Sequence, residues 1–245
     1  MISLIGVTLL LLVAVALSSN RAAIQLRTVG MAFALQVTIG FIGLFTDWGS
    51  AALATASEYV AVLLSYSRAG MEFMFGGLVG PSDSLGFIFA FSVLPVVIFF
   101  SSLIAVLYHA RVMQWLIQIM GGGLRALLRT SHTESLSAAA NVFVGQAEAP
   151  LVARPYIPDM TRSELFAVMV GGMASIAGSV MAGDVALGVP LEYLLAASVM
   201  AAPGGLLMAK LMEPEIDQPV EPAPGEKLAS EQYINFIDAA ATGAM

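Results

Sequence analysis

The chain has 245 residues, of which 58% are hydrophobic and 11% are charged, and its formal net charge is −7. A soluble domain carries about a quarter charged residues, so this chain lacks the side chains for a water-facing surface, which favours a protein embedded in lipid. The negative charge gives no electrostatic basis for binding nucleic acid. The absence of cysteine and the presence of only two histidines exclude disulfides and thiolate sites and leave few ligands for zinc.

Apolar segments long enough to cross a bilayer follow one another along the chain. They comprise residues 1–19, 28–46, 84–110, 165–183 and 193–209, and none has a charged residue in its interior. The first has no Lys or Arg before Asn20 and is followed by a second apolar run, which favours a retained membrane helix over a cleaved signal peptide. The pattern predicts an all-α integral membrane protein, a multi-span helical bundle whose partner is the lipid bilayer.

The stretch 47–83 between the second and third apolar segments is more mixed, with charged residues among aromatic ones. Its Trp48, Tyr59, Tyr66 and Phe73 suit the boundary between membrane and water. We predict an interfacial helix followed by a Gly/Pro turn, and the alternative is a helix that spans the membrane.

Basic residues, with the exception of Arg68, gather at one end of the predicted spans. They are Arg21, Arg27, Arg111, Arg125, Arg129, Arg154, Arg162 and Lys210. Placing them in the cytoplasm predicts a multi-pass protein of the cell inner (plasma) membrane with its N-terminus outside. Residues 111–164 must then leave the cytoplasmic side and return to it, and because they are too apolar for an ordinary loop, we predict a re-entrant helical hairpin.

The predicted organisation is linear along the chain. It comprises scaffold-like spans 1–3 over 1–110 including the interfacial segment 47–83, an amphipathic segment and the hairpin over 111–164 with its tip at 141–150, spans 4–5 of a transport region over 165–212, an acidic Pro-rich loop over 213–231, and the start of a truncated span over 232–245.

The hairpin tip carries the strongest functional signal. Gly145 permits a break, and Pro150 suits the first turn of a new helix. A break at membrane depth frees backbone groups, which are tolerated where they line a cavity or bind something. Gln146 and Glu148 lie in this break between apolar neighbours and provide donors and acceptors for a polar ring. The alternative is that Glu148 marks a loop outside the membrane.

The fourth apolar segment contains Gly171-Gly-Met-Ala-Ser-Ile-Ala-Gly-Ser179. These small residues are compatible with a close packing face on which Ser175 and Ser179 bond back to their own helix. They are also compatible with a locally unwound helix whose carbonyls face the hairpin break. The residues themselves leave both interpretations open.

Several strings occur in the order that is typical of one family. Asn141-Val-Phe-Val-Gly-Gln-Ala-Glu-Ala-Pro-Leu151 is followed by Arg-Pro-Tyr-Ile, Thr161-Arg-Ser-Glu-Leu165, Gly-Gly-Met-Ala-Ser-Ile-Ala-Gly-Ser-Val-Met-Ala, and Asn235-Phe-Ile-Asp-Ala-Ala-Ala-Thr-Gly-Ala244. This order resembles the signature of the concentrative nucleoside transporters over essentially the whole chain. The resemblance implies a homotrimer with a scaffold part and a mobile transport part that contains two re-entrant hairpins.

The resemblance also implies a substrate site and an ion site. It places the nucleobase of a nucleoside at Gln146 and Glu148, with an apolar contact from Val180. It places sodium, the coupling ion, at the Asn141 side chain, the Val144 carbonyl, the Ser175 hydroxyl and the Ile176 carbonyl. The resemblance therefore favours the unwound helix at Ser175. No organic cofactor is implied.

The side-chain oxygens of Asn141 and Ser175 resemble the sodium-coupled members of the family, and proton-coupled transport is the alternative. Two residues depart from the family pattern. Ala147 replaces a usual hydroxyl residue near the base, and Asp184 stands where an aromatic residue is common.

The family's second hairpin and last two spans have no counterpart in these 245 residues. We therefore expect the chain to be incomplete, to carry the base-binding and sodium-binding half, and not to transport as it stands. One alternative is a scaffold or gating protein that does not transport. An enzyme with Glu148 as general acid or base is not expected, because no second intramembrane carboxylate or nucleophile–base pair accompanies it.

Overall fold

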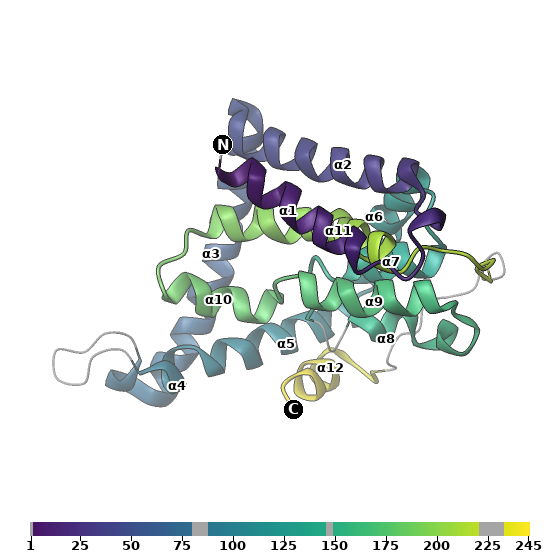
Figure 1. Ribbon diagram of the computed structural model, residues 1–245. Helices are drawn as coiled ribbons and strands as arrows, with labels where there is room; N and C mark the ends of the chain where they lie inside the picture. The colour runs from purple at the N-terminus through teal and green to yellow at the C-terminus, as the bar shows by residue number, and fades with distance from the viewer. Residues whose placement is uncertain (1, 80–87, 146–148, 221–232) are drawn as a thin grey trace. The chain divides into compact units, whose positions relative to one another are not determined.

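The computed structural model describes residues 2–79, 88–145, 149–220 and 233–245 (Figure 1). Every regular element within these ranges is a helix, which confirms the predicted all-α class. The described residues form two compact units, each assembled from separate stretches of the chain.

The first unit is built from residues within 1–39, 115–175 and 198–229. Its elements are α1 (Ile2–Ala16), η1 (Arg21–Ala23), most of α2 (Leu26–Phe45), most of α6 (Val112–Leu128), α7 (His132–Ala140), α8 (Ala149–Ala153), η3 (Arg154–Asp159), α9 (Arg162–Ala174) and most of α11 (Leu191–Met212). Helix α7 packs against α8 and α9, and its side chains are almost all buried.

The second unit is built from residues within 40–114, 176–197 and 230–245. Its main elements are α3 (Asp47–Phe75), η2 (Gly76–Leu78), α4 (Phe89–Ser92), α5 (Leu94–His109), α10 (Gly178–Ala186) and α12 (Phe236–Gly243). Helix α5 packs against both α10 and α12. The Ser102 hydroxyl of α5 donates a hydrogen bond of 2.8 Å to the Ala240 carbonyl of α12.

Three helices are long and apolar enough to cross a membrane within the described residues. They are Leu26–Phe45, Phe89–His109 and Leu191–Met212. They correspond to the predicted second, third and fifth spans. The predicted first span is shorter than expected, because α1 ends at Ala16 and its 15 residues reach only about 22 Å. The predicted fourth span is two helices, α9 and α10, separated by three residues.

The predicted interfacial segment forms one helix of 29 residues, longer than a short surface helix requires. Thr46 caps its start by accepting a hydrogen bond of 3.2 Å from the Gly49 amide. Gly76 ends it with a φ of 55°, a left-handed conformation that glycine adopts without steric cost. Trp48, Tyr59 and Phe73 are all exposed, so aromatic side chains are available to lipid or to the interface along its whole length.

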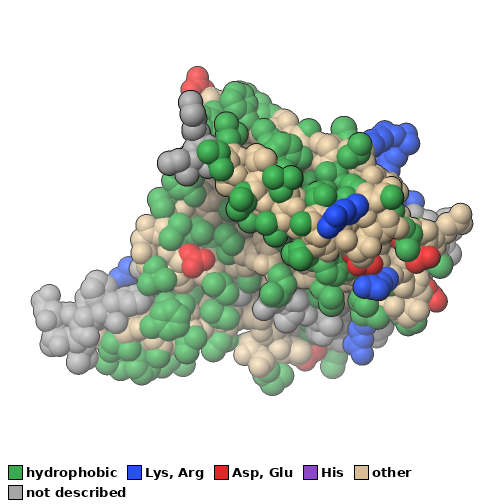
Figure 2. Space-filling model, viewed as in Figure 1, with side chains coloured by type: hydrophobic (Ala, Val, Ile, Leu, Met, Phe, Trp, Pro, Cys, Tyr) green, Lys and Arg blue, Asp and Glu red, His purple; other side chains and the backbone are tan. Residues whose placement is uncertain are grey.

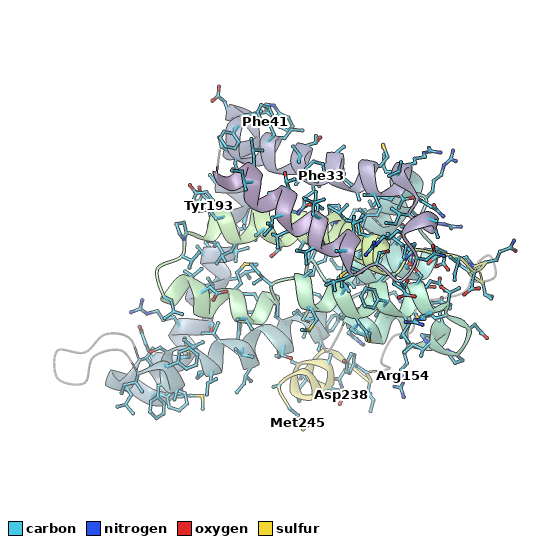
Figure 3. All side chains as sticks on the ribbon, viewed as in Figure 1. Phe33, Phe41, Arg154, Tyr193, Asp238 and Met245 are labelled. Atoms are coloured by element: carbon cyan, nitrogen blue, oxygen red, sulfur yellow. The ribbon has the colours of Figure 1, made fainter. Side chains whose placement is uncertain are left out.

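Hydrophobic side chains reach the surface over much of the face drawn in Figure 2. Phe33 and Phe41 of α2, which are labelled in Figure 3, are exposed, as are Leu4 and Leu12 of α1. Exposed apolar surface of this extent is unfavourable in water and ordinary in a bilayer. The surface therefore agrees with an integral membrane protein.

The compact units do not follow the linear division into 1–110, 111–164 and 165–212. Helices α1 and most of α2 belong to the unit that contains the predicted hairpin, and α3 and α5 belong to the other. Helices that are adjacent in sequence need not pack together, which is why composition alone does not assign them. Which helices act as scaffold and which as transport region stays a prediction.

Candidate functional site

Helix α7 leads into the predicted hairpin tip, and its N-terminus is capped by side chains. The Ser131 hydroxyl accepts a hydrogen bond of 3.3 Å from the Glu134 amide, and the Glu134 carboxylate accepts one of 3.2 Å from the Ser131 amide. This reciprocal pair is a capping box. The helix ends at Ala140, and the backbone turns through residues 141–145 before α8 begins at Ala149. A break between two short helices is therefore present where the sequence predicts one.

The two residues that the resemblance places against the nucleobase, Gln146 and Glu148, lie outside the described residues, as does Ala147. Their roles stay predictions. The Gly145 carbonyl just before them accepts a hydrogen bond of 3.0 Å from the Ala149 amide, so the described ends of the break are linked.

The second break lies between α9 and α10. Helix α9 ends at Ala174, and Ser175 and Ala177 have extended backbones with ψ of 156° and 133°. Helix α10 begins at Gly178. The unwound alternative is therefore present, although the Ser175 hydroxyl also donates to the Gly172 carbonyl at 3.4 Å, as the packing interpretation expected.

Asn141 and Ser175 bring the two breaks together within the first unit. The Ser175 hydroxyl donates to Asn141 Oδ1 at 3.5 Å, a long hydrogen bond. Asn141 is only 2% exposed, and its Nδ2 has no hydrogen-bond partner among the described residues. The Asn141 amide is therefore a buried polar group that lies beside a hydroxyl and has an unpartnered nitrogen. Buried polar groups normally have partners, so this position is suited to a bound polar species.

The other predicted site residues differ in burial and in the unit to which they belong. Val144 is fully buried in the turn that follows Asn141. Ile176 follows Ser175 in the second break. Val180 lies in α10, in the second unit, and is exposed. The ligand roles of the Val144 and Ile176 carbonyls stay predictions.

Gly171 of α9 lies close to the Asn141 side chain. A Cβ atom added at Gly171 would lie 2.9 Å from Asn141 Nδ2. A Cβ atom added at Gly205 of α11 would lie 3.3 Å from the Gly171 Cα atom. Three segments therefore meet closely at glycines, and the Gly171-Gly172 pair in the sequence already indicated a close packing face.

A polar cluster that sequence reasoning missed lies at the other end of α7. Lys210 of α11 forms a buried ion pair with Glu134, and its Nζ donates to the Ser163 hydroxyl at 2.8 Å. A cavity of about 240 Å³ opens beside it, lined in part by Gln25, Arg129 and Glu215. None of the predicted site residues within the described ranges lines this cavity. The available signals were a lysine close to an apolar segment and the two Ser/Thr-x-x-Glu sequences at 131–134 and 161–164.

Comparison with known proteins bears on the whole chain. Residues 5–78 match the family described as "Na+ dependent nucleoside transporter N-terminus", and residues 90–189 match the family described as "Nucleoside recognition". The nucleoside permease NupC of Helicobacter pylori is 44% identical, with 99% of this chain and 58% of that protein covered. The human sodium/nucleoside cotransporter 1 is 39% identical, with 100% of this chain and 37% of that protein covered.

Solved structures of the transporter CNTnw match in two states. The inward-facing, substrate-bound structure has a TM-score of 0.92 at 52% identity, with 99% of this chain and 58% of that chain covered. The outward-facing structure of a variant has a TM-score of 0.90 at 51% identity, with 99% of this chain and 57% of that chain covered. The chain spans at most about 60% of the length of these relatives. On this evidence the chain belongs to the concentrative nucleoside transporter family and corresponds to its N-terminal portion.

Proposed function

We propose that this chain carries the nucleobase-binding and sodium-binding part of a nucleoside symporter that works by alternating access. The observation that carries the proposal is the meeting of two helix breaks, where the Ser175 hydroxyl lies 3.5 Å from Oδ1 of the buried Asn141. Broken helices that meet in this way are how secondary transporters build substrate and ion sites.

The chemistry of the two side chains fits a small alkali cation. The Asn141 amide and the Ser175 hydroxyl each offer a neutral oxygen. Each residue is the first residue after its helix, so the main chain of that break lies next to it. Sodium in such a site is held by several neutral oxygens. Val144 and Ile176 would add carbonyl oxygens from the same two breaks. The family description and the human cotransporter both carry sodium in their names, which supports this assignment.

The nucleoside is proposed to bind where Gln146 and Glu148 offer donors and acceptors to the base, with Val180 as an apolar contact. Relatives named for nucleoside transport support the substrate class. Binding followed by release on the other side needs no covalent chemistry, so no residue is assigned a catalytic role. We also propose that the protein is a homotrimer of the inner membrane with its N-terminus outside.

Alternating access is supported by relatives in two orientations, because CNTnw is described in inward-facing and outward-facing states. In this mechanism sodium and nucleoside bind as neighbours and stabilise each other. Their coupling must be reciprocal, so sodium tightens nucleoside binding by the same factor as nucleoside tightens sodium binding. The inward sodium gradient then drives uptake.

The experiment is uridine uptake into proteoliposomes by the protein expressed from its complete reading frame. Uptake is compared in sodium and choline buffers at one pH, and again with an imposed proton gradient. We expect uptake that needs sodium and releases uridine chemically unchanged. Asn141→Ala should weaken the sodium dependence, whereas Asn20→Ala, at an exposed position in the same unit, should not.

Three results would contradict parts of this proposal. Equal uptake in sodium and choline, driven by the proton gradient, would replace sodium with protons. No uptake together with no thermal stabilisation by uridine plus sodium would favour a scaffold that does not transport. Recovery of a changed product would indicate an enzyme.

A further inference from the structure

Lys210 is a buried cation near the end of α11. Its side chain is 8% exposed, and it forms an ion pair with Glu134, which is 1% exposed. Its Nζ also donates to the Ser163 hydroxyl at 2.8 Å and lies 3.4 Å from the Glu215 carboxylate. One ammonium group therefore joins three segments of the first unit, because Glu134 lies in α7, Ser163 in α9 and Glu215 after α11.

These partners all lie at helix starts or hold a helix start. Glu134 belongs to the capping box that begins α7. Ser163 is the second residue of α9, and the Thr161 hydroxyl that caps α9 donates to Glu215 at 2.9 Å. Lys210 and Glu215 therefore connect the first turn of α7 to the first turn of α9.

The same two helices end at the two breaks. Helix α7 has 9 residues and leads to Asn141, and α9 has 13 residues and leads to Ser175. At 1.5 Å per residue the two helices are about 14 and 20 Å long. The helices also pack against each other. A helix does not stretch along its axis, so an offset between the two starts is carried to the two ends.

We infer that Lys210 is a positioning residue for the sodium site: it sets the register of α7 against α9 and so holds Asn141 beside Ser175. The inference rests on the proposed function, since it concerns the same site. A buried ion pair adds little net stability compared with an apolar pair, because both charges lose their hydration. Fixing the register of packed elements is the best-attested use of such buried polar groups.

The test separates register from stability in the protein expressed from its complete reading frame and reconstituted in nanodiscs. The readout is the sodium concentration that gives half of the maximal thermal stabilisation, with choline keeping the ionic strength constant. Lys210→Met leaves Glu134 buried and unpaired, so it should lower the melting temperature and raise this concentration. Residues that lie in a packed network without touching the ligand typically change its binding by roughly two- to thirtyfold, and a rise in that range is expected.

The double variant Glu134→Gln/Lys210→Met removes both charges and should recover most of the melting temperature. It also lacks the hydrogen bond from Lys210 to Ser163, so its half-saturating sodium concentration should stay raised. The matched control is Arg162→Gln. Arg162 pairs with Glu213 at 3.1 Å at the same end of α9, but its side chain is 81% exposed, so sodium binding should not change.

If the double variant has the same half-saturating sodium concentration as the unmodified protein, the inference about Lys210 is wrong, and the assignment of the sodium site is unaffected. If the double variant does not fold, Ser163→Ala decides, because it leaves the Lys210–Glu134 pair intact and removes the Ser163 hydroxyl with its bonds to Lys210 at 2.8 Å and to the Glu213 carbonyl at 2.6 Å. A raised half-saturating sodium concentration supports the inference, and an unchanged one overturns it. An unmodified chain without any specific response to sodium would overturn the sodium assignment itself, and the inference with it.

Discussion

The Asn141 side chain lies directly against Gly171, where an added Cβ atom would be 2.9 Å from Asn141 Nδ2. The contact joins the end of α7 to the last third of α9. It leaves no room for a methyl group unless the amide moves. The position of a proposed sodium ligand is therefore set by the absence of a side chain on the neighbouring helix.

Gly171→Ala should weaken sodium binding without weakening the fold. The new methyl group displaces the Asn141 amide, and alanine in a helix interior is favoured over glycine by roughly 0.5–1 kcal/mol. We expect the half-saturating sodium concentration to rise about tenfold, equivalent to about 1.4 kcal/mol, while the melting temperature without sodium stays equal or increases. Gly122→Ala in α6 is the control, since its added Cβ meets nothing within 4 Å. Equal sodium binding in both variants would show that Asn141 is not held by this contact.

Ser175 and Asn141 should act as one site. Each single alanine variant is expected to remove most of the sodium response, and the double variant should cost much less than the sum of the two, because residues that share a ligand are not additive. The measurement is a double-mutant cycle on the half-saturating sodium concentration. Additive effects would place the two side chains in independent roles.

The crossing of α5 and α12 in the second unit depends on Gly243. A Cβ atom there would lie 2.8 Å from the Ser101 carbonyl oxygen and 3.0 Å from the Ser102 Cα atom, both less than normal contact distances. Gly243→Val should therefore lower stability by about 1–3 kcal/mol, the usual cost of overpacking. Thermal unfolding in detergent measures it, with Gly77→Val as the control at a position whose added Cβ meets nothing. Equal melting temperatures for the two variants would argue against the crossing.

Orientation can be read by labelling, because the chain contains no cysteine and single cysteines can be introduced into an unreactive background. Glu192→Cys should react with a membrane-impermeant maleimide in intact cells. Arg129→Cys and Arg162→Cys should react only after permeabilisation. All three positions are exposed, so a lack of reaction reports the side of the membrane. The reverse pattern would invert the proposed topology.

Composition and pattern predicted a large part of this fold. The apolar segments became helices because a backbone in lipid must satisfy its own hydrogen bonds, and the helix break after Asn141 followed from Gly145 and Pro150. The family resemblance is confirmed by the matches over both halves of the chain. The second break was harder to predict, because small residues such as Ser175 are equally compatible with a continuous packed helix.

The Lys210 cluster could not be predicted because its members are distant in the sequence. Ser163 and Lys210 are 47 residues apart, and only the packing of the first unit brings them to 2.8 Å. As a sequence feature, Lys210 indicated only the cytoplasmic end of a span. The assignment of helices to the two compact units was unpredictable for the same reason, since α1 and α5 are both apolar helices without Asp, Glu, Lys or Arg but pack into different units.

The central claim is that the breaks at Asn141 and Ser175 form a sodium site coupled to nucleoside binding. The most direct measurement is equilibrium binding of labelled uridine to the protein expressed from its complete reading frame, in nanodiscs at one pH, over a range of sodium concentrations. We expect uridine affinity to rise with sodium in the unmodified protein and to be nearly independent of sodium in Asn141→Ala. The claim would be contradicted if uridine affinity were independent of sodium in the unmodified protein, or if it rose equally with sodium in Asn141→Ala.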